Sequence, residues 1–122
     1  MNLMTKQFLR SSDADWNAVS RTVATYTSDA IRPHFATGKA ALLVLTSAGS
    51  LVITFEVSNN GDDWYEPYDT TGSKINTVAD GLTADRWVTF DLPVCEWIRF
   101  KFVLTVATST VSAVYHQRES VR

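Results

Sequence analysis

Apolar and polar residues alternate in two long segments of the chain. In the segment 51–59, every second residue is apolar: Leu51, Ile53, Phe55 and Val57. In the segment 97–104, the same spacing selects Ile98, Phe100, Phe102 and Leu104, whereas the positions between them include Arg99 and Lys101. Successive side chains of a β-strand point to opposite faces, so each segment predicts a strand with one face in a hydrophobic core. We expect the second face of 97–104 to meet water, at least in part.

Shorter segments that are rich in β-branched and aromatic residues continue this pattern. They cover residues 21–27, 31–35, 40–46, 64–68, 74–78, 86–92 and 110–118. Gly or Asn separates several of them, and Asn60-Gly61 is the strongest hairpin signal in the chain. Pro33 lacks an N–H group, so the segment around it belongs at a sheet edge or a bulge. The spacing predicts an all-β fold, an antiparallel two-sheet β-sandwich, with a jelly roll favoured because the Cys–Trp–Cys signature of immunoglobulin domains is absent.

The first 20 residues do not follow this pattern. We expect residues 1–20 to form an N-terminal arm or a short helix, capped by Ser12 or Asp13, ahead of a β-sandwich domain at 21–122. The arm carries apolar side chains with neither a period of two nor a full helical stripe: Leu3, Met4, Phe8, Leu9 and Trp16. These side chains need a cover, either on a neighbouring subunit or on the chain's own sandwich. We predict the first arrangement, which makes them candidate contacts in an oligomer.

Composition and charge narrow the class of protein. A chain of 122 residues with 45% hydrophobic content can bury a core in one domain without disulfides or metal. The net charge is -2 and Lys and Arg are dispersed, so we expect no nucleic-acid partner. The first ten residues lack the apolar run of a signal peptide, and no segment approaches the roughly 20 apolar residues of a membrane span. We therefore expect no membrane partner and synthesis in the cytoplasm.

Residues that could support catalysis are few and scattered. The two histidines, His34 and His116, have no nucleophile motif beside them and no Cys or His at ligand spacing, so we interpret both as half-exposed strand residues. The single cysteine, Cys95, is expected to lie in a strand and is interpreted as a small buried hydrophobe. No Gly-rich phosphate loop occurs. We expect a protein that is not an enzyme and that has no cofactor.

Acidic residues cluster in one turn region, at Asp62, Asp63, Glu66 and Asp69. The paired carboxylates of a glycosidase must flank a cleft, whereas this clustering indicates a solvated loop. The carboxylate oxygens of these residues lack the spacing of an EF-hand loop, so no metal site is predicted. The pattern does not decide whether the turn binds a calcium ion.

Aromatic residues lie close to these acids and form a candidate surface-binding loop. The loop consists of Asn59, Asn60, Asp62, Trp64, Tyr65 and Tyr68. Flat aromatic rings beside Asn and Asp are typical of sugar-binding surfaces, which points to a glycan as a ligand. In the alternative, which we favour, Trp64 covers the end of the core and Trp97 shields strand hydrogen bonds, because large aromatic side chains usually serve packing.

The segment 53–67 reads ITFEVSNNGDDWYEP, an apolar strand that ends in Ser-Asn-Asn-Gly and is followed by Trp and Tyr. It resembles a pattern in small β-sandwich structural proteins of tailed bacteriophages, and the segments 97–102 and 109–115 resemble the same set. The resemblance covers residues 51–118 and is most like jelly-roll head decoration, or cement, proteins. Similar pairs of a strand and a turn with Trp occur in carbohydrate-binding modules.

This resemblance implies a virion structural protein, made in the host cytoplasm, that binds the assembled head and stabilises it. It implies two partners, a major capsid protein and further copies of the chain, often as a trimer. The five apolar residues of the expected arm are then candidate capsid contacts as well. The resemblance carries no residue-level binding motif. The alternative is a carbohydrate-binding or receptor-binding module of a phage tail or fibre.

Overall fold

The computed structural model describes residues 2–33 and 38–120, with the side chains of 6–33 and 38–117. This part of the chain forms nine strands and contains no helix. The strands are β1 (Asn2–Phe8), β2 (Val19–Arg21), β3 (Ala24–Thr27), β4 (Lys39–Thr46), β5 (Ser50–Ser58), β6 (Thr77–Leu82), β7 (Arg86–Asp91), β8 (Trp97–Thr105) and β9 (Ser109–Ser120). Within the described residues, no helix is long and apolar enough to cross a membrane.

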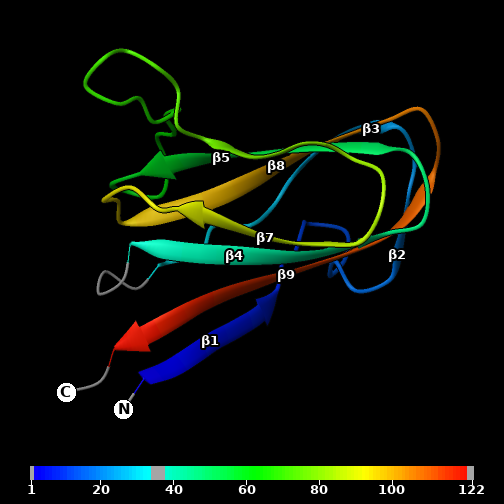
Figure 1. The fold of residues 1–122 in the computed structure, drawn as a ribbon, viewed down its shortest axis with the longest axis horizontal. Coiled ribbons are helices and arrows are strands. Elements are labelled where there is room, and N and C mark those ends of the chain that lie inside the picture. Colours follow the sequence, from blue (N-terminus) through cyan, green and yellow to red (C-terminus); the bar gives the residue numbers. More distant parts are fainter. Residues whose placement is uncertain (1, 34–37, 121–122) are drawn as a thin grey trace.

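The strands form two antiparallel sheets that pack face to face (Figure 1). One sheet has the order β1-β9-β4-β7, with β2 also paired to β9, and the other has the order β3-β8-β5-β6. The pairs β1/β9, β3/β8, β4/β7 and β5/β6 are nested in sequence and alternate between the two sheets. Such a winding of one long hairpin is the topology of a jelly roll. The prediction of an all-β, antiparallel two-sheet sandwich is confirmed.

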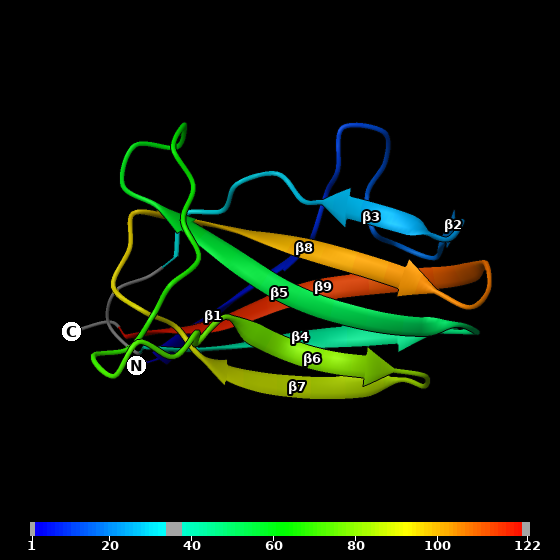
Figure 2. The ribbon, with the colours of Figure 1, turned by 90° about the horizontal axis from the view of Figure 1, so that it is seen from above.

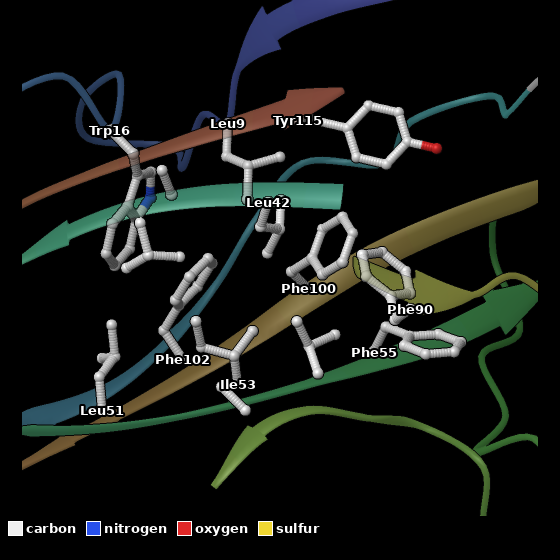
Figure 3. Packing of buried hydrophobic residues seen from close by; sticks show 14 of the residues in the cluster. Leu9, Trp16, Leu42, Leu51, Ile53, Phe55, Phe90, Phe100, Phe102 and Tyr115 are labelled. Atoms are coloured by element: carbon white, nitrogen blue, oxygen red, sulfur yellow. The ribbon is translucent and has the colours of Figure 1, made fainter. Parts of the chain in front are cut away.

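The core lies between the sheets, and Figure 3 shows how side chains from both meet there. Of the inner residues that alternation predicts for β5 and β8, Val57 is half-buried. The others are buried, namely Leu51, Ile53, Phe55, Ile98, Phe100, Phe102 and Leu104. Opposite them, β4 supplies Leu42, and β9 supplies Tyr115, whose ring centroid lies 5.9 Å from that of Phe100. Burying a large apolar side chain stabilises a fold by roughly 1.5–3 kcal/mol, so this layer holds the two sheets together.

Residues 21–27, which the sequence predicts as one strand, are divided between the two sheets. Arg21 ends β2 and Ala24 begins β3, because the chain crosses from one sheet to the other between them. In the expected strand 31–35, Ile31 makes a single bridge to β8, and residues 34 and 35 lie outside the described residues. The edge of the second sheet is therefore formed by the short β3 and this bridge.

The connection between β5 and β6 departs furthest from the predicted strands, and Figure 2 shows it extending beyond one end of the second sheet. Tyr65 makes an isolated bridge to Val57 of β5, beyond the part of that edge that β6 pairs with, and Tyr68 makes one to Lys74. Strand β6 begins at Thr77 and includes Gly81, which lies between the expected strands 74–78 and 86–92. Its pairing with β5 contains two register shifts, and Gly81 has a positive φ of 88°, which other residues rarely adopt.

The first 20 residues do not form an arm. β1 pairs along its length with β9, and the chain returns to the same edge of β9 as β2. Between these strands, Leu9 and Trp16 are buried in the core, where the ring of Trp16 stacks on that of Phe102 with 4.3 Å between centroids. The prediction that Leu9 and Trp16 contact a neighbouring subunit is therefore wrong. Residue 20 is not a boundary between an arm and the sandwich, because the segment before it completes the first sheet and the core.

Candidate functional site

The outer face of the β1-β9-β4-β7 sheet carries an apolar surface at its centre. Directly paired residues of antiparallel strands point to the same face of a sheet. The register therefore forms one row across four strands, Phe8, Val114, Leu43 and Trp87. Phe8 is 43% exposed and Trp87 is 51% exposed, whereas Leu43 is half-buried and Val114 is buried. These four residues and the exposed Leu45, which follows on β4, are named the apolar face.

His116 lies beside this row, next to the ring of Trp87. The two ring centroids are 4.5 Å apart, and His116 is buried, which corrects the expectation of a half-exposed residue. Burial lowers the pKa of His116, a hydrogen bond to the Val114 carbonyl opposes this shift, and the charge of Lys6 lowers the pKa further. The uncharged ring keeps the centre of the apolar face free of charge at neutral pH. The other histidine, His34, lies outside the described residues.

Of the apolar residues that the sequence predicts as subunit or capsid contacts, the structure places Phe8 on this surface. Leu9 and Trp16 lie in the core, as described above. The side chains of Leu3 and Met4 lie outside the described residues. For Phe8, a role in contacts stays a prediction.

The outer face of the β3-β8-β5-β6 sheet is polar by contrast. On its two central strands, towards one end, Arg99 of β8 and Glu56 of β5 form an ion pair with 2.9 Å between Nη2 and Oε1. The guanidinium of Arg99 lies 4.4 Å from the ring centroid of Trp64, so the connection between β5 and β6 folds back onto this face. Trp64 therefore packs on the outer face of a sheet, and not at the end of the core as we expected.

The turn that begins the candidate surface-binding loop is held by its own hydrogen bonds. The side-chain oxygen of Asn60 accepts hydrogen bonds from the backbone N–H groups of Asp62 and Asp63, both at 2.9 Å. The side-chain amide of Asn60 donates to the Asp63 carboxylate at 2.9 Å, and the Ser58 hydroxyl accepts from the N–H of Gly61 at 2.9 Å. These bonds fix the turn, and they engage two of the side-chain oxygens that a calcium ion would need.

The other acidic residues of this region are also engaged. Glu66 forms an ion pair with Lys74 at 2.6 Å, and this hydrogen bond lowers the pKa of the Glu66 carboxyl. Asp69 accepts hydrogen bonds from Thr71 and Ser73, which lower its pKa in the same way. Among the residues that the structure describes, no group of three His, Cys, Asp or Glu side chains is placed to hold one metal ion.

A shallow groove lies beside the turn. It has a volume of about 280 Å³ and is lined by Val57, Ser58, Asn59, Tyr65, Val94 and Cys95. Tyr65 is 63% exposed, so most of its side chain meets solvent. Of the six residues predicted for the surface-binding loop, the structure brings only Asn59 and Tyr65 to this groove. Tyr68 is exposed outside the groove.

Cys95 lies in the connection between β7 and β8, and not in a strand as the sequence suggested. Its side chain is partly buried, and burial raises the pKa of the thiol, with a further contribution from the charge of Glu96. A thiol that stays protonated at neutral pH is a poor nucleophile. The environment of Cys95 therefore suits a packing role.

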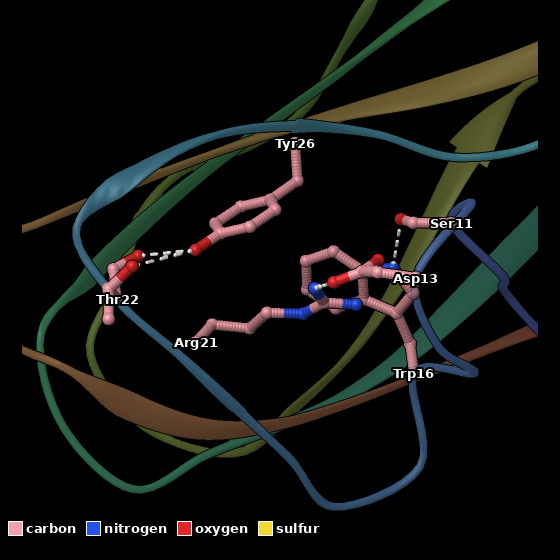
Figure 4. A network of polar contacts seen from close by, with 6 residues as sticks. All are labelled: Ser11, Asp13, Trp16, Arg21, Thr22 and Tyr26. Atoms are coloured by element: carbon pink, nitrogen blue, oxygen red, sulfur yellow. Dashed lines mark hydrogen bonds and ion pairs between the residues drawn. The ribbon is translucent and has the colours of Figure 1, made fainter.

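Arg21 forms a buried polar cluster that the sequence analysis missed. Its side chain points inward from β2, is almost completely buried, and lies between the rings of Trp16 and Tyr26, at 4.3 and 4.8 Å from their centroids (Figure 4). Nη1 of Arg21 donates to the Asp13 carboxylate, and this hydrogen bond lowers the pKa of Asp13. The Trp16 indole donates to the Ser11 hydroxyl at 2.7 Å. The cluster closes the sandwich at the edge formed by β2 and β3, so its role is structural.

Comparison with solved structures shows where this fold recurs. The SPBc2 prophage-derived protein YomS has a TM-score of 0.56 and 12% sequence identity, and the match covers 96% of each chain. A chain in the structure of infectious bursal disease virus, Gx strain, has a TM-score of 0.51 and 13% sequence identity. That match covers 94% of the present chain but only 31% of the viral chain. At these identities the likeness shows a shared fold. No protein-family model matches the chain, and no curated protein sequence matches it.

Proposed function

We propose that this chain is a virion structural protein of a tailed bacteriophage, and that it binds the assembled head as a decoration, or cement, protein. The observation that carries the proposal is the fold. A jelly roll similar to a prophage-derived protein over 96% of both chains, and similar to part of a chain in a virus structure, supports a viral structural role. The resemblance of the segment 53–67 to decoration proteins supports the finer assignment.

The surface of the molecule supports a role in binding. Exposed apolar patches on a protein surface mark interaction sites. The apolar face crosses all four neighbouring strands of one sheet, and it exposes large apolar side chains at both ends of its row, Phe8 and Trp87, and at Leu45. The proposal places its partners in the virion, namely a major capsid protein and further copies of this chain. It assigns no catalytic activity and no cofactor.

A decoration protein acts by mass action on an assembled state. A copy that binds the particle but not the free capsid subunits stabilises the particle by RT ln(1 + [L]/Kd) at each site. At a free concentration of 100 times Kd, this amounts to about 2.7 kcal/mol per site. Because the contribution is repeated at every site, moderate affinity is enough to raise the temperature at which particles release their genome.

Binding to particles tests the proposal. Purified protein should pellet with heads that lack it, at micromolar concentration, and it should not associate with the same capsid protein after disassembly. Particles that carry the protein should release their genome at a higher temperature than particles without it. A protein that stays in the supernatant, or that binds assembled and disassembled capsid protein equally, would rule out the cement mechanism.

A second candidate function, glycan binding on a tail or fibre, is favoured by one observation. Tyr65 exposes its ring at the groove beside Asn59, which is the arrangement of an aromatic platform with a polar neighbour. On a glycan array, Tyr65→Ala should then abolish binding, whereas Tyr68→Ala should not, because Tyr68 is also exposed but lies outside the groove. Equal loss in both variants, or no binding by the unaltered protein, would reject this function.

A further inference from the structure

We infer that the apolar face is the surface on which a second copy of this chain binds, giving a dimer with two-fold symmetry. The inference goes beyond the proposed function, because it names the residues of a contact between copies and does not depend on what the virion partner is. It also replaces the contact through an N-terminal arm, since the structure places Leu9 and Trp16 of that segment in the core.

The order of side chains in the row suits pairing with itself. The row has an aromatic residue at each end, Phe8 and Trp87, and two aliphatic residues between them, Val114 and Leu43. A two-fold axis that lies between two such sheets, parallel to the strands, brings β1 of one copy over β7 of the other. Phe8 of one copy then meets Trp87 of the other, and Val114 meets Leu43, so each apolar side chain faces an apolar side chain.

The area of the face is sufficient for a specific contact. Four strands spaced by about 4.8 Å and a length of eight residues at about 3.3 Å each give a flat area of roughly 500 Å² per copy. Contact over the whole sheet face therefore covers about 1,000 Å² in two copies, which is the lower limit for a biological interface. Trp87 and Phe8 expose about half of their side chains at the two edges of this area, and buried aromatic anchors supply much of the energy of an interface.

The charged residues near the row are placed so that water can leave the apolar face when a second copy binds. His116 lies under Trp87 with a lowered pKa, so no charge is trapped at the centre in neutral solution. Lys6 lies on the edge strand β1, where it reaches solvent at the rim. Lys39 and Asp91 form an ion pair at one end of the face, so their charges offset each other. Among the side chains that the structure describes, the centre of the face therefore holds no unpaired charge whose desolvation would oppose the contact.

The other outer face does not offer such a surface. Its two central strands carry the Arg99–Glu56 ion pair and the charged Lys101, and Trp64 already covers the Arg99 guanidinium. This difference supplies a matched control. Leu43 on β4 and Val103 on β8 are half-buried aliphatic residues on the outer faces of central strands, one in each sheet. A lysine at either position introduces the same charge on a different face.

Sedimentation at micromolar concentration, on the full chain alone, tests the inference. The unaltered protein should have twice the 13.6 kDa mass of one chain. Leu43→Lys should be a monomer, and Val103→Lys should remain a dimer, with circular dichroism showing that both are folded. Trp87→Ala removes a side chain that is half exposed in the single chain, so it leaves the core intact and should raise the Kd of the dimer at least tenfold.

Three results would overturn the inference: a monomeric unaltered protein, a trimer, or a dimer that survives both Leu43→Lys and Trp87→Ala. A trimer counts against it because two copies that pair through the same face cover that face completely, so it cannot bind a third copy. Particle binding separates this inference from the proposed function. A monomer that pellets with heads would overturn only the dimer, whereas a dimer that ignores heads would overturn only the decoration role.

Discussion

Trp16 joins the chain's N-terminal segment to the core, and its replacement by alanine tests that role. The indole is fully buried, stacks on Phe102 and meets the ring of Tyr26 edge-on at 5.5 Å between centroids. It also covers the guanidinium of Arg21 and donates a hydrogen bond to Ser11. Trp16→Ala removes all of these contacts at once, so it should destabilise the whole sandwich.

The size of the loss follows from these contacts. Replacing a buried Trp or Phe by Ala typically costs about 3–5 kcal/mol, because the lost transfer free energy adds to the free energy of the cavity. The value for Trp16 should lie in the upper half of this range, since Arg21 also loses an aromatic partner worth about 0.5–2 kcal/mol. A domain has a free energy of unfolding of about 5–15 kcal/mol. The variant should therefore be folded only marginally or not at all.

Urea unfolding, followed by circular dichroism, measures this loss. With a slope of about 2 kcal/mol/M, a loss of 4–5 kcal/mol lowers the midpoint by about 2 M. Tyr68→Ala is the matched control, because Tyr68 is a large aromatic residue that is exposed, and its loss should be below about 1 kcal/mol. A loss of less than about 1 kcal/mol for Trp16→Ala would refute the placement of this segment in the core.

Three further predictions concern the fold. Removing residues 1–20 should abolish the cooperative thermal transition, because this deletion takes away β1 and two core side chains. Since the pKa of His116 is lowered in the folded state, the unfolded chain gains a proton first below about pH 6.5, so the melting temperature should fall from pH 7 towards pH 5, and less so in His116→Gln. Gly49→Ala would place Cβ 2.7 Å from the Ala107 carbonyl oxygen at a φ of +74°, and should lower the free energy of unfolding by more than about 2 kcal/mol, against about 1 kcal/mol for Gly72→Ala, whose Cβ meets open space.

The strands with strong alternation could be predicted from the sequence, and the N-terminal segment could not. In β5 and β8, every second residue is large and apolar, so the local pattern alone identifies the buried face. β1 has a mixed sequence, and its partner β9 lies at the other end of the chain. A short edge strand whose partner is so far away in the sequence carries no local alternation of apolar and polar residues that would predict it. Trp16 lies outside any strand, where no period applies to it.

The apolar face is formed by the register of paired strands and not by a sequence motif. Each of the four strands contributes only one residue to the row of the apolar face, and the strands are not consecutive in sequence. No window of the sequence contains this surface, so it emerged only from the pairing of β1, β9, β4 and β7. Arg21 was missed for a related reason. Its inward position follows from the register of β2 with β9, which a three-residue strand does not reveal.

Quantitative mass spectrometry of purified virus particles tests most directly whether this chain is a virion structural protein. The proposal predicts that particles of an encoding phage contain the chain in a fixed ratio to the major capsid protein, and that deleting its gene removes it and lowers the temperature of genome release. Infected cells that contain the folded chain but yield stable particles without it would contradict the claim.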